Sequence, residues 1–389
     1  MSHPQTHRAL ILDQIGQPLR VDNAYPTPQP TPGSAIVRIL AAATLSYSRE
    51  IYNGNRKYNL STPCVPGNGA IGRVVALGAD ATTLQEGDLV LIDIFVRGRD
   101  NHRACALSGV HDGHSGPAKR MMHGEWRDGT YAEYAKLPLE NCFVLDERRL
   151  LGSPSTDSIY AAATAQGEIG LGYTVEDLLH AASYLVPFGG LRDVGLGVSE
   201  TVLVSPATGM FGSAAVHVAL AMGANVIAMG RNTDALEKLK ADVVAGGQGH
   251  HIHTVAITNN IEQEMSAIAQ IGLPVDVYFD ISPPAAAGAT YTKSGILSLR
   301  QGGRVSLMGG MGSDVSIPIN AVVQRSLALK GKWMYEREDV VRLIHMVESG
   351  RLRLGKKGII GRFGLEQWKQ AFDAAAEQSG PGQMAVIVP

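Results

Sequence analysis

The sequence predicts an α/β fold of two domains, a strand-rich barrel followed by a doubly wound parallel sheet. At 389 residues the chain is longer than a single hydrophobic core usually supports, so two domains are expected. Short β segments bounded by turn residues occupy its first third, and strands alternate with helices from Glu200 onward. With 45% hydrophobic and 18% charged residues, the composition is that of an ordinary globular protein.

The expected barrel rests on segments that combine β-forming residues with bounding Gly, Pro or Asp. These segments are RALILDQIG (8–16), AIVRILAAAT (35–44), GAIGRVVALG (69–78), GDLVLIDIFV (87–96) and GTYAEYAKLP (129–138). The four prolines of AYPTPQPTPG (24–33) predict an extended connection between two of these strands.

Longer helical patterns begin after Leu150, with apolar residues at helical spacing over 158–170 and 174–186. Alternating strands and helices follow: TVLVSP, GSAAVHVALAMG, NVIAMGR, TDALEKLKA, VDVYFDI and GRVSLMGG. Helices are expected in REDVVRLIHMVESG and LEQWKQAFDAAAE, and the last strand, MAVIVP, is expected to return to the first domain. The predicted domains are therefore 1–155 with 336–389, and 156–335.

The charge distribution and the apolar segments argue against nucleic acid and membrane as partners. The net charge is -2 and like charges form no long block, so neither a nucleic-acid arm nor a membrane-surface helix is indicated. Pro206 and several glycines interrupt the most apolar stretch, 202–229, which argues against a membrane span. The cysteines at 64, 105 and 142 form no CxxC pair, and the N-terminus lacks a signal-peptide pattern. We therefore expect a cytoplasmic protein without disulfides.

A dinucleotide-binding turn is predicted where the strand TVLVS runs through PATGMFG into a helix. Gly209 is expected to let the turn close and Gly212 to let helix and strand approach, while the helix N-terminus offers N–H groups to a pyrophosphate. The first glycine of the usual triplet is missing and Pro206 stands near its place, so a buried strand-turn-helix without a ligand is the alternative. The candidate residues of this turn are Thr208, Gly209, Met210, Phe211 and Gly212.

The end of the next strand favours NADPH over NADH. Proteins that bind NAD place an Asp or Glu here to bind the ribose hydroxyls, whereas this strand ends in Gly230, Arg231 and Asn232. Gly230 leaves room for a 2′-phosphate, and the planar fork of Arg231 suits that phosphate. Ser282, Met308, Gly309 and Gly310 follow two later strands, and we expect them to hold the nicotinamide at the carboxyl edge of the sheet.

The chain resembles the medium-chain dehydrogenase/reductase superfamily, and within it the zinc-free quinone oxidoreductase and enoyl reductase types. The resemblance covers nearly the whole chain and is carried by PGNGAIGRVVALGADATTLQEGDLV, GTYAEYAKLP, SETVLVSPATGMFGSAAVHVALAMGANVIAMGR and GGRVSLMGGMG. It implies a GroES-like β-barrel catalytic domain, a Rossmann domain and a homodimer formed through Rossmann edge strands, with residues 294–317 as the expected segment.

Comparison with the zinc-dependent members of this superfamily predicts that both the catalytic and the structural zinc site are absent. The first catalytic ligand position holds Leu45, and the Gly-His-Glu motif is replaced by Gly67, Asn68 and Gly69. Catalytic zinc needs about three protein ligands, and the loop of the structural zinc holds only Cys105. Two groups of histidines, 102–123 and 250–253, are expected to be exposed and metal-free.

Without zinc to polarise a carbonyl, reduction of an activated C=C bond of an enone, enal or quinone fits the sequence best. Tyr47 is the first candidate to bind the substrate oxygen or supply the proton, although solvent is an alternative acid. Ser46, Tyr52 and Asn68 are further donor candidates, beside the nicotinamide according to the resemblance.

Two other functions stay open at this stage. One is a zinc-independent carbonyl reductase or secondary alcohol dehydrogenase acting on a small carbonyl substrate. The other is an NADPH-binding protein with a sensory or non-redox role. The substrate itself is not specified, because its pocket is expected to come from the loops NGNRKYNLST and FVRGRDNHRACALSGVHDGHSGPAKRMMHGEW.

Overall fold

The computed structural model describes residues 3–152, 170–286, 288–355, 358–378 and 380–389. The chain divides into two compact units, the first of residues 1–182, 354–379 and 383–389 and the second of residues 183–353 and 380–382. The expected boundary between residues 155 and 156 lies outside the described residues, as does the helix expected over 158–170 except for Gly170. Residues 170–182, which were expected in the second domain, belong to the first unit. On the C-terminal side, residues 336–353 belong to the second unit.

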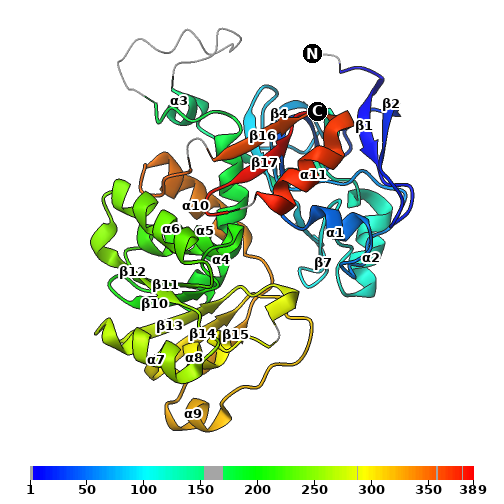
Figure 1. Cartoon of the computed structure of the whole chain (residues 1–389). Coiled ribbons are helices and arrows are strands. Elements are labelled where there is room, and N and C mark those ends of the chain that lie inside the picture. The colour runs from blue at the N-terminus through cyan, green and yellow to red at the C-terminus, as the bar shows by residue number, and fades with distance from the viewer. Residues whose placement is uncertain (1–2, 153–169, 287, 356–357, 379) are drawn as a thin grey trace. The chain divides into compact units, whose positions relative to one another are not determined.

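The first unit is built on antiparallel strands, as Figure 1 shows for the blue and cyan part of the chain. Its strands are β1 (Thr6–Ile11), β2 (Arg20–Pro26), β3 (Ser34–Thr44), β4 (Ala70–Leu77), β5 (Leu89–Ile92), β6 (Phe95–Arg97), β7 (Cys105–Leu107), β8 (Tyr134–Pro138), β9 (Cys142–Val144), β16 (Ile359–Phe363) and β17 (Met384–Ile387). Seven of them form one sheet in the order β16-β17-β3-β4-β5-β9, with β8 paired to β3. β1 with β2 and β6 with β7 form two-stranded sheets.

The C-terminal strand returns to the first unit as predicted. β17 pairs antiparallel with β3, and Ala385 lies opposite Thr44. Residues 27–33 connect β2 to β3 as expected, but residues 24–26 of the predicted connection belong to β2. The predicted strand 87–96 is two strands, β5 and β6, separated by Asp93 and Ile94. The buried Asp93 accepts the backbone N–H of Phe95 at 2.8 Å, and this local hydrogen bond fixes the break between the strands.

Short helices connect the strands of the first unit. They are α1 (Ser48–Tyr52), α2 (Gly116–Met121), the π-helix η1 (Met122–Trp126), the 3-10 helix η2 (Leu139–Asn141), α3 (Glu147–Leu151), the 3-10 helices η4 (Asp177–Leu179) and η7 (Leu365–Gln367), and α11 (Trp368–Glu377). α11 buries Ala371, Phe372 and Ala375. It contacts β16 and β17, and α1 packs against it.

The second unit holds a parallel sheet of six strands in the order β12-β11-β10-β13-β14-β15. The strands are β10 (Thr201–Ser205), β11 (Asn225–Gly230), β12 (Ile252–Ala256), β13 (Val275–Asp280), β14 (Leu299–Leu307) and β15 (Ala328–Gly331). In chain order this is 3-2-1-4-5-6, the arrangement of the Rossmann fold, which reverses direction between β10 and β13. Such a reversal opens a crevice at the carboxyl ends of the strands.

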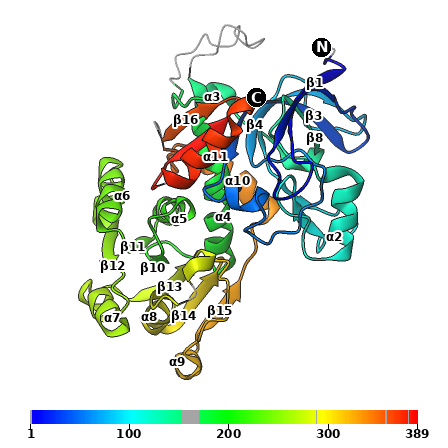
Figure 2. The same cartoon turned by 45° about the vertical axis from the view of Figure 1, so that its right-hand side comes forward.

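Helices cover both faces of this sheet. They are α4 (His180–Asp193), whose first residues belong to the first unit, α5 (Met210–Ala221), α6 (Thr233–Ala245), α7 (Ile261–Gln270), α8 (Tyr291–Leu297), α9 (Ile319–Gln324) and α10 (Arg337–Glu348), with 3-10 turns η5 (Gly249–His251) and η6 (Pro284–Ala286). α5 and α6 lie on one side of the sheet and α7 and α8 together on the other (Figures 1 and 2).

The doubly wound sheet predicted from the alternating segments is thereby confirmed. Its core holds β-branched and aromatic residues such as Ile227, Val305 and Tyr278, all fully buried. The segment expected to form a dimer, 294–317, contains β14, which lies between β13 and β15, and the strands at the edges of the sheet are β12 and β15. In the described part of the chain no helix is long and apolar enough to cross a membrane.

Candidate active site

The loops predicted to hold the cofactor meet at one edge of the second unit's sheet. β11, β10, β13 and β14 are neighbours and run parallel, so their carboxyl ends lie side by side. Residues 206–212 follow β10, residues 231 and 232 follow β11, residues 281–283 follow β13 and residues 308–310 follow β14. The topology thus brings the whole predicted cofactor set to the point where the strand order reverses.

Gly212 is the glycine that the first turn requires. A Cβ atom on Gly212 would lie 2.0 Å from the carbonyl oxygen of Pro206, so only glycine allows α5 to approach the end of β10 so closely. Gly209 differs from the expectation, because its φ is -85° and a Cβ there would meet no atom within 4 Å. It precedes α5 without a side-chain cap, so the first N–H groups of the helix, from Met210 and Phe211, stay available to an anion.

The end of β11 is packed more tightly than the sequence suggested. A Cβ on Gly230 would lie 2.8 Å from Cγ2 of Thr208. Glycine is therefore needed here because the end of β11 contacts the loop that follows β10. Burial raises the pKa of Tyr291, and the charge of the exposed Arg231 is a smaller effect that opposes this rise. The Asn232 side chain accepts the backbone N–H of Ala235 at 3.0 Å and caps α6.

A buried carboxylate organises the other two loops. Asp280 accepts the Tyr278 hydroxyl at 2.7 Å and the Ser282 N–H at 3.0 Å. Burial and the Asp280 charge raise the pKa of Tyr278 well above its ordinary value, so this phenol stays a donor. A Cβ on Gly309 would lie 2.4 Å from the Ser282 nitrogen, and the N–H of Gly310 donates to the Ser282 carbonyl at 3.1 Å. The loops after β13 and β14 are therefore held against each other by these contacts.

These contacts leave mainly backbone atoms facing the edge of the sheet. The Ser282 hydroxyl is hydrogen-bonded to the Tyr291 hydroxyl at 2.9 Å. The Met308 side chain lies against Gly190 of α4, where an added Cβ would come within 2.1 Å of its sulfur. The N–H groups of Met308 and Gly309 donate to the Asp280 carbonyl and that of Gly310 to the Ser282 carbonyl, so a cofactor at these loops would meet the carbonyl oxygens of 308–310 and the Arg231 guanidinium.

In the first unit, the residues at the lost zinc positions lie at one end of the β3–β4 pair. Ala42 lies opposite Ala70, and the Ala43 N–H donates to the Gly69 carbonyl at 2.9 Å. Leu45 follows β3 directly and Asn68 precedes Gly69, so the register of this strand pair brings the two positions together. An apolar side chain and an amide therefore stand at the two positions that the family resemblance assigns to zinc ligands.

Asn68 is held from both sides by Thr130. The Asn68 N–H donates to the Thr130 hydroxyl oxygen at 3.0 Å, and that hydroxyl donates to the Asn68 carbonyl at 2.6 Å. The side-chain oxygen of Asn68 accepts the N–H of Gly69 at 2.7 Å. Among the described residues, none accepts a hydrogen bond from its amide nitrogen, Nδ2, which is free to donate to a substrate oxygen.

The two candidate tyrosines occupy different surroundings. Tyr52 is 3% exposed, stacks on Phe372 at 5.6 Å and donates its hydroxyl to the Gly109 carbonyl at 3.0 Å, so its hydroxyl holds two loops together. Tyr47 is half-buried and lies under the Arg56 guanidinium, 3.9 Å from its Cζ atom to the ring centroid. Burial raises the pKa of the Tyr47 phenol, the neighbouring Tyr58 raises it further and Arg56 lowers it, so Tyr47 is protonated near neutral pH.

Further polar residues lie in the turn after β3 and at the start of α4. Ser46, one of the predicted donors, is half-buried, while the buried Ser48 side chain accepts the N–H of Leu45 at 3.1 Å and fixes this turn. His180 is 2% exposed and begins α4, and Ala182 lies where a Cβ on Gly69 would come within 2.7 Å. His180 belongs to no motif in the sequence, so its position could only come from the structure.

The residues present do not fit a catalytic zinc. Within the described ranges, no three His, Cys, Asp or Glu side chains gather so that they could hold a metal ion. Neither Leu45 nor the amide of Asn68 is a usual zinc ligand, and zinc prefers three or more from Cys, His and carboxylates. We therefore derive no step of the reaction through a metal.

One prediction about the histidine-rich loop was wrong. His111 was expected to be exposed, but it is 6% exposed and accepts the Gly113 N–H at 2.8 Å. Its ring meets Tyr58 edge-on at 5.0 Å between centroids. Burial is the largest of the effects that lower the pKa of His111 to about 4, which makes it a neutral core residue.

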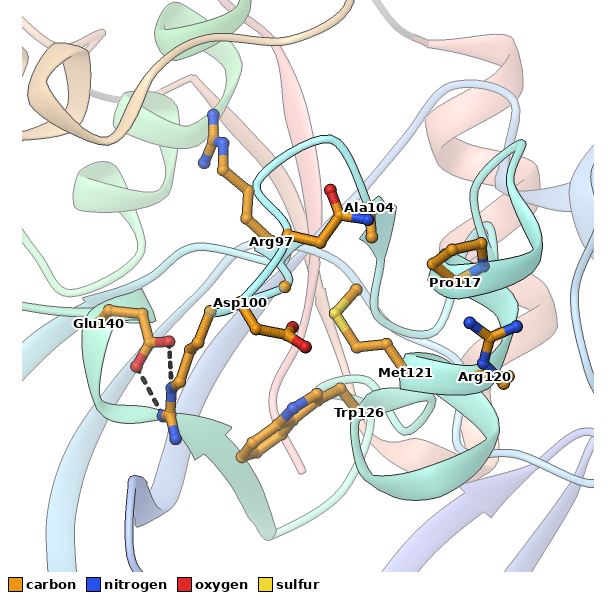
Figure 3. A pocket seen from close by; sticks show the side chains of 11 residues that line it. Arg97, Asp100, Ala104, Pro117, Arg120, Met121, Trp126 and Glu140 are labelled. Atoms are coloured by element: carbon orange, nitrogen blue, oxygen red, sulfur yellow. Dashed lines mark hydrogen bonds and ion pairs between the residues drawn. The ribbon is translucent and has the colours of Figure 1, made fainter.

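Residues of the loop 95–126, together with Glu140, line an open pocket of about 440 Å³. Figure 3 shows Met121 and Trp126 between Glu140 on one side and Arg120 on the other. Arg99 binds Glu140 through two nitrogens, each 2.7 Å from a carboxylate oxygen. None of the predicted catalytic residues lines this cavity, so it is separate from the end of β3 and β4.

Comparison with known proteins agrees with this architecture. Residues 31–147 match the family model "Alcohol dehydrogenase GroES-like domain", and residues 211–349 match "Zinc-binding dehydrogenase". An "Alcohol dehydrogenase" of Rhizobium meliloti (strain 1021) is 25% identical over 89% of this chain and 90% of its own.

Two solved structures share the fold. A short chain alcohol dehydrogenase from E. coli CFT073, complexed with cofactor NADH, aligns with a TM-score of 0.76 at 16% identity, over 99% of this chain and 100% of that chain. A putative zinc-binding dehydrogenase from Sinorhizobium meliloti 1021, bound to NADP, aligns with a TM-score of 0.72 at 19% identity, with the same coverage. Since the two family models together span more than half of the sequence, the chain belongs to the medium-chain dehydrogenase/reductase superfamily of oxidoreductases.

Proposed function

We propose that the chain is a zinc-independent, NADPH-dependent reductase that transfers hydride to an activated C=C bond of an enone, enal or quinone. The observation that carries this proposal is the end of the β3–β4 pair, where Leu45 and Asn68 stand at the zinc positions while Tyr47 offers a hydroxyl. Hydrogen-bond donors of this kind stabilise an enolate oxygen, whereas an unactivated ketone needs stronger polarisation.

The cofactor is proposed to be NADPH, held by the second unit. The N–H groups at the start of α5 would bind the pyrophosphate and Arg231 the 2′-phosphate. Positions 230–232, at the end of β11, hold no carboxylate that would repel a phosphate there. The backbone of Gly309 and Gly310, braced by Ser282, would hold the nicotinamide, which when bound supplies hydride from its C4 carbon.

In the proposed reaction the first unit orients the substrate. Tyr47 and the Asn68 amide donate hydrogen bonds to the carbonyl oxygen, and hydride arrives at the β-carbon of the C=C bond. The π pair of the C=C bond shifts into the bond between the α-carbon and the carbonyl carbon, and the C=O π pair moves to the oxygen, which gives an enolate. The enolate then takes a proton at its α-carbon from solvent or Tyr47. Because its pKa is raised, Tyr47 stays protonated near neutral pH and can donate a hydrogen bond to the enolate oxygen.

A second candidate function is reduction of a ketone to a secondary alcohol. It is favoured by the alcohol dehydrogenase named among the relatives and by Tyr47, which is a possible acid for an alkoxide. The product separates the two functions, because alkene reduction retains the C=O group and ketone reduction removes it.

The cofactor proposal is tested by fluorescence titration of metal-stripped protein with NADPH and NADH, repeated for Arg231→Ala. We expect NADPH to bind at least about tenfold tighter than NADH, and Arg231→Ala to remove this preference while leaving NADH binding unchanged. Equal affinities in the parent protein would contradict NADPH specificity. Metal analysis of untreated protein is the companion measurement, and stoichiometric zinc would contradict the zinc-independent mechanism.

A further inference from the structure

Arg56 forms no ion pair with a carboxylate of the described residues. Several other arginines of the first unit do: Arg8, Arg20, Arg49, Arg73 and Arg99 pair with Glu366, Asp13, Asp373, Glu147 and Glu140 respectively. No carboxylate of the described residues forms an ion pair with Arg56, and its buried Nε atom has no hydrogen-bond partner there. A half-buried cation without an ionic partner costs free energy, so binding of an anionic ligand to Arg56 would be favourable.

Aromatic rings fix the guanidinium in place. The Arg56 Cζ atom lies over the Tyr47 ring at 3.9 Å and over the Tyr58 ring at 5.1 Å. The backbone holds the same position, since the Arg56 N–H donates to the Glu50 carbonyl at 2.8 Å. These contacts place the cation over the ring faces, while its N–H donors lie in the guanidinium plane and point outward from its edges.

Arg56 lies next to a residue of the proposed active site. Arg56 stacks on the tyrosine that we propose as the donor to the substrate, and it belongs to the loop NGNRKYNLST that was expected to line the substrate pocket. An edge with several N–H donors in a fixed fork matches the two oxygens of a carboxylate.

We propose that Arg56 binds a carboxylate of the substrate, so that the enzyme acts on anionic activated alkenes such as unsaturated keto acids. The inference rests on the proposed reductase function and adds the charge of its substrate. Arg56 is then a residue of substrate specificity, which contacts the substrate away from the bond that is reduced.

The test uses 4-oxopent-2-enoate and its methyl ester, which carry the same enone and differ in charge. We expect the parent enzyme to reduce the acid with the higher kcat/KM, and Arg56→Met to lower this value for the acid by about tenfold or more while changing that of the ester less than about twofold. Arg56→Lys should restore part of the activity towards the acid, because it keeps the charge and loses the fork. Lys57→Met removes an equal charge from the next, exposed residue and should leave both substrates unaffected.

Equal losses for acid and ester in Arg56→Met would show that Arg56 serves only to position Tyr47, and would overturn the proposal. A binding measurement separates this failure from failure of the reductase function. Calorimetric titration with the saturated 4-oxopentanoate and its methyl ester needs no turnover. Arg56-dependent binding of the acid alone supports carboxylate recognition even where neither alkene is reduced, whereas equal or absent binding of both overturns it.

Discussion

The two candidate regions differ in the groups that we propose for ligand recognition. At the carboxyl edge of the second unit's sheet, glycines allow loops to approach closely, and we propose that backbone groups bind the cofactor. At the end of β3 and β4 in the first unit, we propose that the side chains of Tyr47, Asn68 and Arg56 contact the substrate. A site formed by backbone groups tolerates few substitutions, because a new side chain changes its shape. A site formed by side chains can change its chemistry by substitution while the fold stays the same.

The largest effect is expected from Gly212, and it tests whether the first region depends on shape. Gly212→Ala puts a methyl group 2.0 Å from the Pro206 carbonyl oxygen, so α5 must move away from β10. We expect a loss of about 3 kcal/mol in the free energy of unfolding, measured in urea, and weaker NADPH binding. Gly209→Ala is the matched control, since a Cβ there meets nothing within 4 Å, and its unfolding should match the parent.

Tyr47→Phe is the corresponding test of the second region. It removes the hydroxyl and keeps the ring on which Arg56 stacks. We expect kcat for enone reduction to fall by about a hundredfold with little change in stability. Tyr52→Phe should behave in the opposite way, because it loses the hydrogen bond to Gly109 and about 1 kcal/mol of stability but little of kcat. Similar kinetics for both variants would remove the distinction drawn between the two tyrosines.

The sequence predicted the first of these regions better than the second. Alternating strands and helices have a clear period, and parallel strands place their carboxyl ends together, so the cofactor loops could be located without a structure. What the pattern could not show was why each glycine is present. Gly230 proved to accommodate Thr208, and Gly209 has room for a side chain.

In the first unit the missing information was tertiary. The stacking of Arg56 on Tyr47, the burial of His111 and the approach of Ala182 to Gly69 join segments from different parts of the chain, and none has a sequence period. The residue types at positions 45 and 68 could be compared with a family, and that comparison supplied the argument against zinc. The partner of each side chain had to come from the structure.

His111 provides a pH test of how closely the first unit is packed around these side chains. Its pKa is lowered from 6.5 to about 4 on folding, so between these values the unfolded chain takes up a proton that the folded protein excludes. Stability is therefore complete above about pH 6.5 and is lost as the pH falls towards 4. Urea unfolding at pH 7 and pH 4.5 should show that the parent loses roughly 2 kcal/mol more than His111→Asn. The same pH dependence in both proteins would mean that His111 titrates normally.

Asn232 lies beside the candidate cofactor site, but its side chain caps a helix. Its substitution has the smallest expected effect on stability and binding. Because its oxygen caps α6, Asn232→Ala should cost about 1 kcal/mol of stability and leave NADPH affinity unchanged. Asn232→Asp keeps the cap but adds a negative charge beside Arg231, so it should preserve stability and weaken NADPH binding more than NADH binding. A loss of NADPH affinity in Asn232→Ala would instead assign the amide to the cofactor. Thermal unfolding and fluorescence titration of the two variants thus separate a residue that shapes the loop from one that contacts the ligand.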